Sequence, residues 1–163
     1  MSEPISEAEI ESMIDKAAPN AVFREPGFKV RAVLAKRTFL EKIFLLHEEF
    51  AKPQNQIRIE RMSRHLYDIH RMLSTPIAKE AIGDNELYND VIEHRRAFIG
   101  LKGFDYNSLA KPTLNIIPPE SVYDAWKADY DKMQKDMIYS APITFETIIE
   151  DLRSLNNEIN QSK

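Results

Sequence analysis

Residues 37–50 read RTFLEKIFLLHEEF, and this stretch decides the fold class. Thr38 and Glu41 have the spacing of a capping box, which predicts that a helix begins at Thr38. Pro53 predicts that the helix ends just before it. At about 100° per residue, the apolar side chains gather on one side of that helix: Phe39, Leu40, Ile43, Leu46 and Phe50. The stretch therefore predicts an amphipathic helix with a broad buried face.

Two other residues in this helix, Lys42 and His47, raise a question about function. Lysine is almost never fully buried unless it is paired. Lys42 is therefore either a surface lysine whose stem covers apolar neighbours or a cleft lysine that contacts a phosphate. His47 falls inside the apolar sector, where a hydrogen-bonded core histidine is expected. Because Ala51 stands four residues after His47, the zinc-protease motif HExxH is excluded. Glu41 and Glu48 share the opposite, polar face.

The rest of the chain carries mostly helical patterns. One partly alternating run, residues 28–34, is the only strand expected, and residues 101–118 are expected to form an ordered irregular loop. We expect a mostly α fold, a bundle-like single domain over residues 1–163 with five to six helices and one short strand near residues 28–34. Caps and apolar spacing predict the further helices at about 6–18, 56–73, 84–99, 119–137 and 144–159.

Composition narrows the class of protein. The 163 residues are 43% hydrophobic and 29% charged, which fits one ordinary globular domain. The absence of cysteine excludes a disulfide framework and a thiolate metal site. No signal peptide is expected at the acidic N-terminus, and no apolar run approaches the roughly 20 residues of a membrane span. The net charge of −4 disfavours a surface that coats nucleic acid. We expect a cytoplasmic protein without a membrane partner.

Residues 58–72 read RIERMSRHLYDIHRM and place polar residues along one helix face. Arg61, Arg64, His65 and Asp68 recur at i, i+3, i+4 and i+7. One interpretation is a solvated face, with Arg64 and Asp68 as an ion pair worth a few tenths of a kcal/mol. The other is an anion-binding stripe, in which guanidinium groups bind phosphate and Asp68 orients an arginine or a lysine. His65 and His70 point in different directions, so no metal site is expected here.

Two further patterns have structural interpretations. Asp129 and Asp131 resemble a magnesium-binding D-x-D pair, but on a helix they point about 200° apart, so they are interpreted as surface charge. The aromatic residues at helical spacing in the same segment could stack on bases, but core packing is expected: Tyr123, Trp126 and Tyr130.

The segments RTFLEKIFLLHEEF and RMSRHLYDIHRML together resemble the AbiEii/AbiGii nucleotidyltransferase toxin family, the toxin half of type IV toxin–antitoxin and phage-defence systems. The resemblance runs from about Phe28 to the end of the chain and includes FDYNSLAKPTLNIIPPE. It implies a helical C-terminal part that closes over an N-terminal nucleotidyltransferase domain. That domain supplies a Gly-containing turn and metal-binding aspartates, and this chain is expected to lack it.

The resemblance also implies site residues. Lys42 matches the lysine of the first C-terminal motif, expected to reach the nucleotide phosphates. Arg64 and Asp68 match the arginine and last aspartate of a second motif, R-D-x-x-D, in which this chain has His65 in place of the first aspartate. Lys42 and Asp68 are thus the expected catalytic residues, and Arg61, Arg64 and His65 are expected to bind nucleotide phosphates. The complete enzyme would use Mg²⁺ and a nucleotide triphosphate, with RNA or another acceptor and an antitoxin as partners. The isolated chain is expected to be inactive.

A second hypothesis is a stand-alone helical protein-interaction module. Its partner surface would be the polar stripe of residues 58–71 or the apolar seam from Phe145 to Ile159, whose three- and four-residue spacing predicts packing along another helix.

Overall fold

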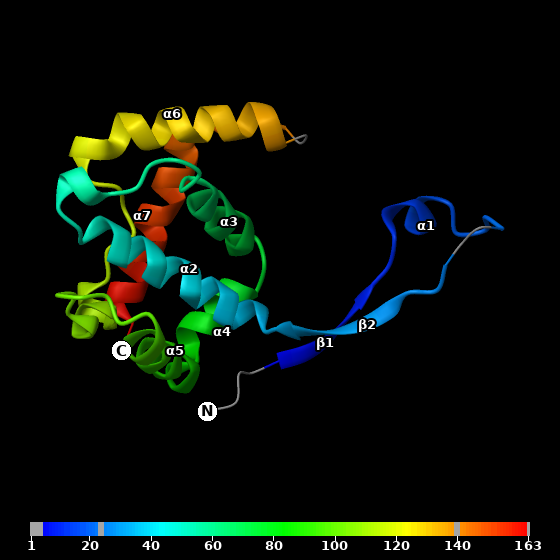
Figure 1. Ribbon diagram of the computed structural model, residues 1–163, viewed down its shortest axis with the longest axis horizontal. Helices are drawn as coiled ribbons and strands as arrows, with labels where there is room; N and C mark the ends of the chain where they lie inside the picture. The colour runs from blue at the N-terminus through cyan, green and yellow to red at the C-terminus, as the bar shows by residue number, and fades with distance from the viewer. Residues whose placement is uncertain (1–4, 23–24, 139–140, 163) are drawn as a thin grey trace.

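The computed structural model describes residues 5–22, 25–138 and 141–162. Figure 1 shows a helical body from which a long hairpin projects. Seven α-helices and one two-stranded sheet in this part of the chain confirm the mostly α prediction. In chain order, the strands and α-helices are β1 (Ile5–Ile10), α1 (Met13–Ala17), β2 (Phe28–Val33), α2 (Ala35–Phe50), α3 (Arg64–Leu73), α4 (Ile77–Gly83), α5 (Asn85–Phe98), α6 (Glu120–Met137) and α7 (Phe145–Gln161).

The hairpin corrects the prediction for the first segment. The helix expected from Ser6 is wrong, because Ile5–Ile10 form β1, antiparallel to β2, with Ile5 opposite Val33. The expected strand near residues 28–34 is confirmed, but it has a partner strand. Residues 6–10, SEAEI, also alternate small or apolar residues with charged ones, and pairing along six residue positions outweighs the local capping signal. Only the five-residue α1 remains helical.

Helix α2 packs against α3, α4 and α5 and carries the centre of the core. Phe39, Leu40 and Ile43 are completely buried, as their spacing predicts. The helix begins at Ala35, before the predicted start, and the backbone N–H of Thr38 donates to the Leu34 carbonyl at 3.1 Å. Thr38 therefore lies in the first turn and is not the cap.

Helix α3 begins at Arg64, later than predicted. The residues before it form a 3₁₀ turn and a loop in which Arg61 has a φ of 60°. This left-handed conformation is incompatible with an α-helix, so α3 cannot extend back through Arg61. Asp129 of α6 holds this loop, because its carboxylate accepts hydrogen bonds from Arg61 N (2.7 Å), Ser63 N (3.0 Å) and Ser63 Oγ (2.5 Å). The interpretation of Asp129 as surface charge is therefore wrong.

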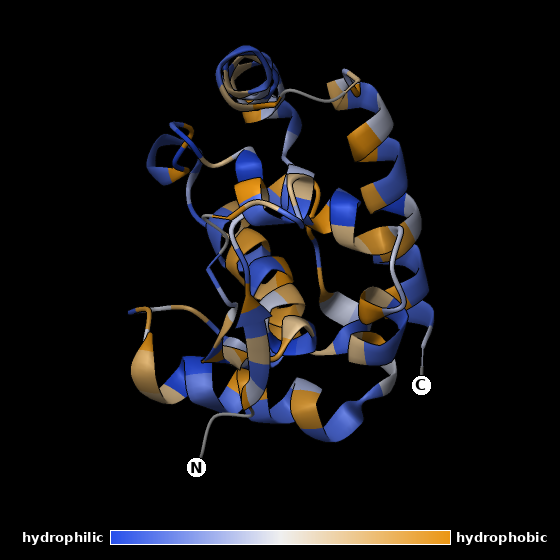
Figure 2. Ribbon diagram, turned by 90° about the vertical axis from the view of Figure 1, so that its right-hand side faces the viewer, coloured by the Kyte–Doolittle hydropathy of each residue, from blue (hydrophilic) through white to orange (hydrophobic). Residues whose placement is uncertain are grey.

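Helices α6 and α7 complete the core. Trp126 and Tyr130 are fully buried, and the Trp126 ring lies 4.8 Å from that of Phe50, which confirms core packing. Figure 2 shows hydrophobic and hydrophilic residues alternating around the helices. The α7 seam is buried in the body, where α7 contacts α3 and α6: Phe145, Ile148, Leu152, Leu155 and Ile159.

Single residues between the helices mark where the helices begin and end. Asp84 caps α5 as predicted, since its Oδ1 accepts from Leu87 N at 3.1 Å. Gly100, with a φ of 54°, follows the end of α5, also as predicted. Helix α4 was not predicted as a separate helix; Pro76 precedes it, a position that suits proline. Residues 101–118 contain two 3₁₀ turns and otherwise irregular backbone.

Candidate functional site

The two helices that carry the sequence motifs lie against each other, and Lys42 meets Asp68 between them. Lys42 Nζ donates to Asp68 Oδ2 at 2.7 Å. The Lys42 side chain is 21% exposed and that of Asp68 is 42% exposed, so the pair sits at the edge of the α2–α3 contact. Of the two partners considered for Asp68 in the sequence, the lysine is the one that the structure pairs with it.

His65 lies beside this pair, three residues before Asp68 and on the same face of α3. Burial is the main cause that lowers the His65 pKa to about 4, and the positive charges of Lys42 and Arg64 lower it further, against the opposing effect of Asp68. Its Nδ1 is buried without a partner. His65 is therefore a neutral imidazole at neutral pH, able to form a hydrogen bond but carrying no positive charge. We call Lys42, Arg64, His65 and Asp68 the α2–α3 site.

Arg61 and Arg64 are both exposed but lie differently. Arg64 is close enough for its charge to act on His65. Both arginines also line an open cavity of about 290 Å³ at the N-terminal end of α3. That cavity carries as many carboxylates as cations, so it is not a purely positive anion site: besides the arginines, it is lined by Glu60, Asp129, Lys132, Met133, Asp136 and Met137. The structure thus places both arginines at the cavity beside α6, with Arg64 also close enough to His65 for its charge to lower the His65 pKa.

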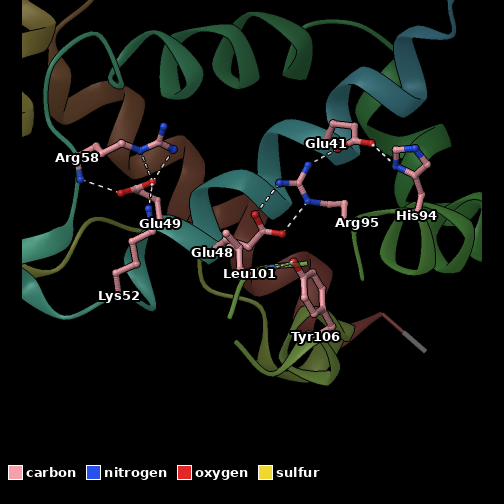
Figure 3. A network of polar contacts seen from close by, with 9 residues as sticks. All are labelled: Glu41, Glu48, Glu49, Lys52, Arg58, His94, Arg95, Leu101 and Tyr106. Atoms are coloured by element: carbon pink, nitrogen blue, oxygen red, sulfur yellow. Dashed lines mark hydrogen bonds and ion pairs between the residues drawn. The ribbon is translucent and has the colours of Figure 1, made fainter. Parts of the chain in front are cut away.

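The polar face of α2 is buried against α5, which the sequence pattern did not predict. Arg95 of α5 donates from Nε to Glu48 Oε1 at 2.8 Å and from Nη2 to Glu48 Oε2 at 2.6 Å, and it also binds Glu41 (Figure 3). Arg95 and Glu48 are each only 5% exposed. Burial opposes the charge of Arg95, but Glu48 and Glu41 outweigh it and raise its pKa. The seven-residue spacing of the two glutamates was visible in the sequence, but their partner was not.

Glu49 forms a second buried ion cluster, also drawn in Figure 3. Its side chain, 1% exposed, accepts from Arg58 N at 2.7 Å and Arg58 Nε at 2.8 Å, and from Lys52 Nζ at 2.8 Å. Burial works to raise the Glu49 pKa, but the hydrogen bonds from Arg58 and Lys52 lower it overall. Arg58 is therefore fixed to α2.

His47 has the geometry of a hydrogen-bonded core histidine. Its Nδ1 accepts from Asn115 N at 2.8 Å, so in the neutral ring the proton is on Nε2, which lies 3.0 Å from Ser108 Oγ. Ser108 Oγ in turn donates to the Asp105 carbonyl at 2.6 Å. Burial lowers the His47 pKa. His47 therefore holds the irregular segment against α2.

The residues of the α2–α3 site do not fit a Mg²⁺ ion. Asp68 is its one carboxylate, and it is paired with Lys42. Within residues 5–22, 25–138 and 141–162, no three histidine or carboxylate side chains come together in a way that could hold a metal. Across the same ranges, no helix is long and apolar enough to cross a membrane.

Comparison with known proteins identifies the family. A family model described as "Nucleotidyl transferase AbiEii toxin, Type IV TA system" matches residues 2–151. No curated protein and no solved structure matches the chain. The matched span begins well before Phe28, so it includes the hairpin as well as both motif helices. The chain therefore belongs to the AbiEii nucleotidyl transferase toxin family of type IV toxin–antitoxin systems.

Proposed function

We propose that this chain is the helical C-terminal part of a nucleotidyltransferase and completes its nucleotide cleft. In such a reaction an acceptor hydroxyl attacks the α-phosphorus of a nucleotide triphosphate, the new phosphoester bond forms, and pyrophosphate leaves. The protein contributes mainly positioning and neutralisation of charge on the phosphoryl oxygens. Over residues 1–163 we treat the chain as a single helical domain of that larger machinery.

The observation that carries this proposal is the 2.7 Å pair between Lys42 and Asp68 at the α2–α3 contact. A lysine at a partly exposed helix contact can turn from its carboxylate partner to an incoming phosphate, where its charge stabilises the developing negative charge. Asp68 then holds the Lys42 ammonium in position before the nucleotide binds. We propose Lys42 and Asp68 as the catalytic residues on this basis.

The remaining site residues are proposed to bind the nucleotide phosphates. Arg64 adjoins His65 on α3, close enough for its charge to lower the His65 pKa, and its guanidinium suits bidentate binding of phosphate. Arg61 lines the same cavity beside α6 as Arg64, where it would bind a second phosphate. His65, being neutral, would donate a hydrogen bond instead of a charge.

The other components of the reaction are proposed to come from outside the α2–α3 site. A nucleotidyltransferase domain would supply the metal carboxylates for Mg²⁺ and hold the triphosphate, and RNA or another molecule would accept the nucleotide. Without that domain the chain is expected to show only weak, salt-sensitive phosphate binding. We further propose that the protein acts as a toxin in phage defence and is controlled by an antitoxin. We place it in the cytoplasm, because nucleotide triphosphates are available in that compartment.

The alternative of a stand-alone interaction module loses one of its two surfaces. The apolar seam of α7 packs inside the body, and Ile148, Leu152 and Ile159 have no exposed surface. The polar stripe of residues 58–71 remains the surface on which that hypothesis depends.

Lys42→Ala, Asp68→Ala and Lys36→Ala test the proposal. Lys36 is a matched control, since it also lies on α2 and also binds an aspartate on another segment, Asp84, at 2.8 Å. With the nucleotidyltransferase domain present, we expect the first two changes to abolish incorporation of labelled nucleotide and to leave the melting temperature nearly unchanged. Lys36→Ala should stay active. Equal activity in all three variants would reject the proposed site.

A further inference from the structure

The cavity of about 290 Å³ beside α6, which we call the α6 cavity, is lined by charged side chains of both signs. Arg61, Arg64 and Lys132 are its cations, and Glu60 and Asp136 are exposed carboxylates in the same lining. Among the residues that the structure describes, none of these five side chains forms an ion pair. The α6 cavity therefore offers both cations and hydrogen-bond acceptors to a ligand.

The backbone at the edge of the α6 cavity is held in an unfavourable conformation. Across the described part of the chain, Arg61 is the one residue other than glycine with a positive φ, 60°. Asp129 stabilises this conformation by accepting hydrogen bonds from Arg61 N at 2.7 Å and Ser63 N at 3.0 Å. Strained backbone that its surroundings hold in place is common at ligand sites. Here it accompanies an arginine that lines the same cavity as Arg64.

The last two turns of α6 give the cavity an apolar wall beside a carboxylate. Met133 and Met137 are four residues apart, so they lie one above the other on the helix, and Asp136 adjoins them. All three line the cavity, and Met137 is 62% exposed. Methionine side chains are flexible and polarizable, and they make favourable contacts with aromatic rings. This wall therefore suits a planar ring that carries hydroxyl groups nearby.

We infer that the α6 cavity binds the nucleoside part of a ribonucleotide whose phosphates lie on Arg61 and Arg64. The base packs against the two methionines, and the ribose hydroxyls donate to the carboxylates of Glu60 and Asp136. Arg64 also belongs to the α2–α3 site, so the phosphates lie at the border between the two. This inference rests on the proposed function, because it assigns a ribonucleotide as the substrate of that site.

The mixed charge of the cavity favours a nucleotide over a simple phosphate. A phosphate alone would pair with the arginines, but it would leave Glu60 and Asp136 facing a negative charge without any donor. A ribonucleotide adds the 2′ and 3′ hydroxyl groups, which carboxylates accept well. A 2′-deoxyribonucleotide lacks one of these donors. The arrangement therefore predicts a preference for ribose over deoxyribose.

NMR titration of the 18.9 kDa chain tests the inference without any transfer reaction. The ligands are the four ribonucleoside triphosphates, their 2′-deoxy counterparts and tripolyphosphate. We expect at least one ribonucleotide to shift the backbone amide signals of Met133 and Met137, and tripolyphosphate to leave these two signals unchanged. That ribonucleotide should bind about tenfold more tightly than its 2′-deoxy counterpart, because the latter lacks one hydrogen bond to a charged group.

Exposed carboxylates provide the variants and their control. Glu60→Gln combined with Asp136→Asn should abolish the ribose preference and retain tripolyphosphate binding. Asp131→Asn should keep the preference, because Asp131 is also exposed on α6 but does not line the cavity. Melting temperatures should stay nearly unchanged in these variants, since all three carboxylates are exposed.

Three results would overturn the inference: equal affinity for ribose and deoxyribose nucleotides, a ribose preference that survives the double variant, or unshifted signals at Met133 and Met137. A different result counts against the proposed function, namely tripolyphosphate binding that Lys42→Ala leaves unchanged. The two failures are therefore distinguishable.

Discussion

Replacing Arg95 with methionine should be strongly destabilising, because Arg95 is the shared cation of Glu48 and Glu41. Glu48 is 5% exposed and both of its oxygens bind this one guanidinium, at 2.8 and 2.6 Å. Arg95→Met would leave the Glu48 carboxylate buried without a counter-charge. Removing one partner of a buried ion pair costs about 3–5 kcal/mol. For a chain of this length, each kcal/mol lowers the melting temperature by roughly 2–4 °C.

The neighbouring Arg96 provides the matched control. It pairs with Glu93 at 3.5 Å, and the two side chains are 44% and 57% exposed. An exposed pair contributes about 0–1 kcal/mol, so Arg96→Met should shift the urea midpoint little. Equal losses in Arg95→Met and Arg96→Met would refute the reasoning that burial decides the cost.

A double variant distinguishes the loss of the ion-pair attraction from the cost of leaving the Glu48 carboxylate buried without a counter-charge. Glu48→Leu with Arg95→Met removes both buried charges and fills the space with apolar atoms, and such replacements are often neutral or stabilising. We expect the double variant to regain most of the stability that Arg95→Met loses. A double variant as unstable as the single one would show that the network stabilises the fold by its attraction.

Three further outcomes are expected. Asp129→Ala removes the acceptor of three hydrogen bonds and should cost about 1–3 kcal/mol in a urea titration, whereas the exposed Asp131→Ala should cost almost nothing. Burial lowers the pKa values of His47 and His65, the latter to about 4; the unfolded chain takes up protons near pH 6.5 while the folded chain does not, so the free energy of unfolding should fall as pH falls from about 6.5 toward 4. His65→Asn should flatten that slope, and an unchanged slope would contradict the assignment. Isothermal titration with tripolyphosphate should show weak binding that high salt abolishes and Lys42→Ala reduces; binding indifferent to Lys42→Ala would place the anion elsewhere.

The sequence predicted those elements whose signals are local. The apolar spacing of α2 and α7, the Asp84 cap and the stop at Gly100 each depend on residues within a few positions of one another. The motif residues Lys42 and Asp68 were also found from sequence, and their helices proved to be adjacent. Their predicted roles in catalysis stay predictions.

The features that were missed depend on partners far along the chain. A capping box at Ser6 is a valid local signal, but it loses to pairing with β2, more than twenty residues away. Glu48 is buried because it pairs with Arg95, and Asp129 is structural because it holds the loop at Arg61. A glutamate at a solvated position and a glutamate in a buried ion pair look alike until the partner helix is placed.

The hairpin of β1 and β2 is joined directly to α2, so the two are expected to move together. Strand β2 ends at Val33 and α2 begins at Ala35, so Leu34 alone separates them. Lys42 stands about two turns into α2, roughly 10 Å along its axis. Because this connection is so short, a movement of the hairpin is passed on to α2, the helix that carries Lys42. A partner that binds the hairpin is therefore expected to shift α2 and, with it, Lys42. Flexible residues inserted after Val33 would uncouple the hairpin from α2.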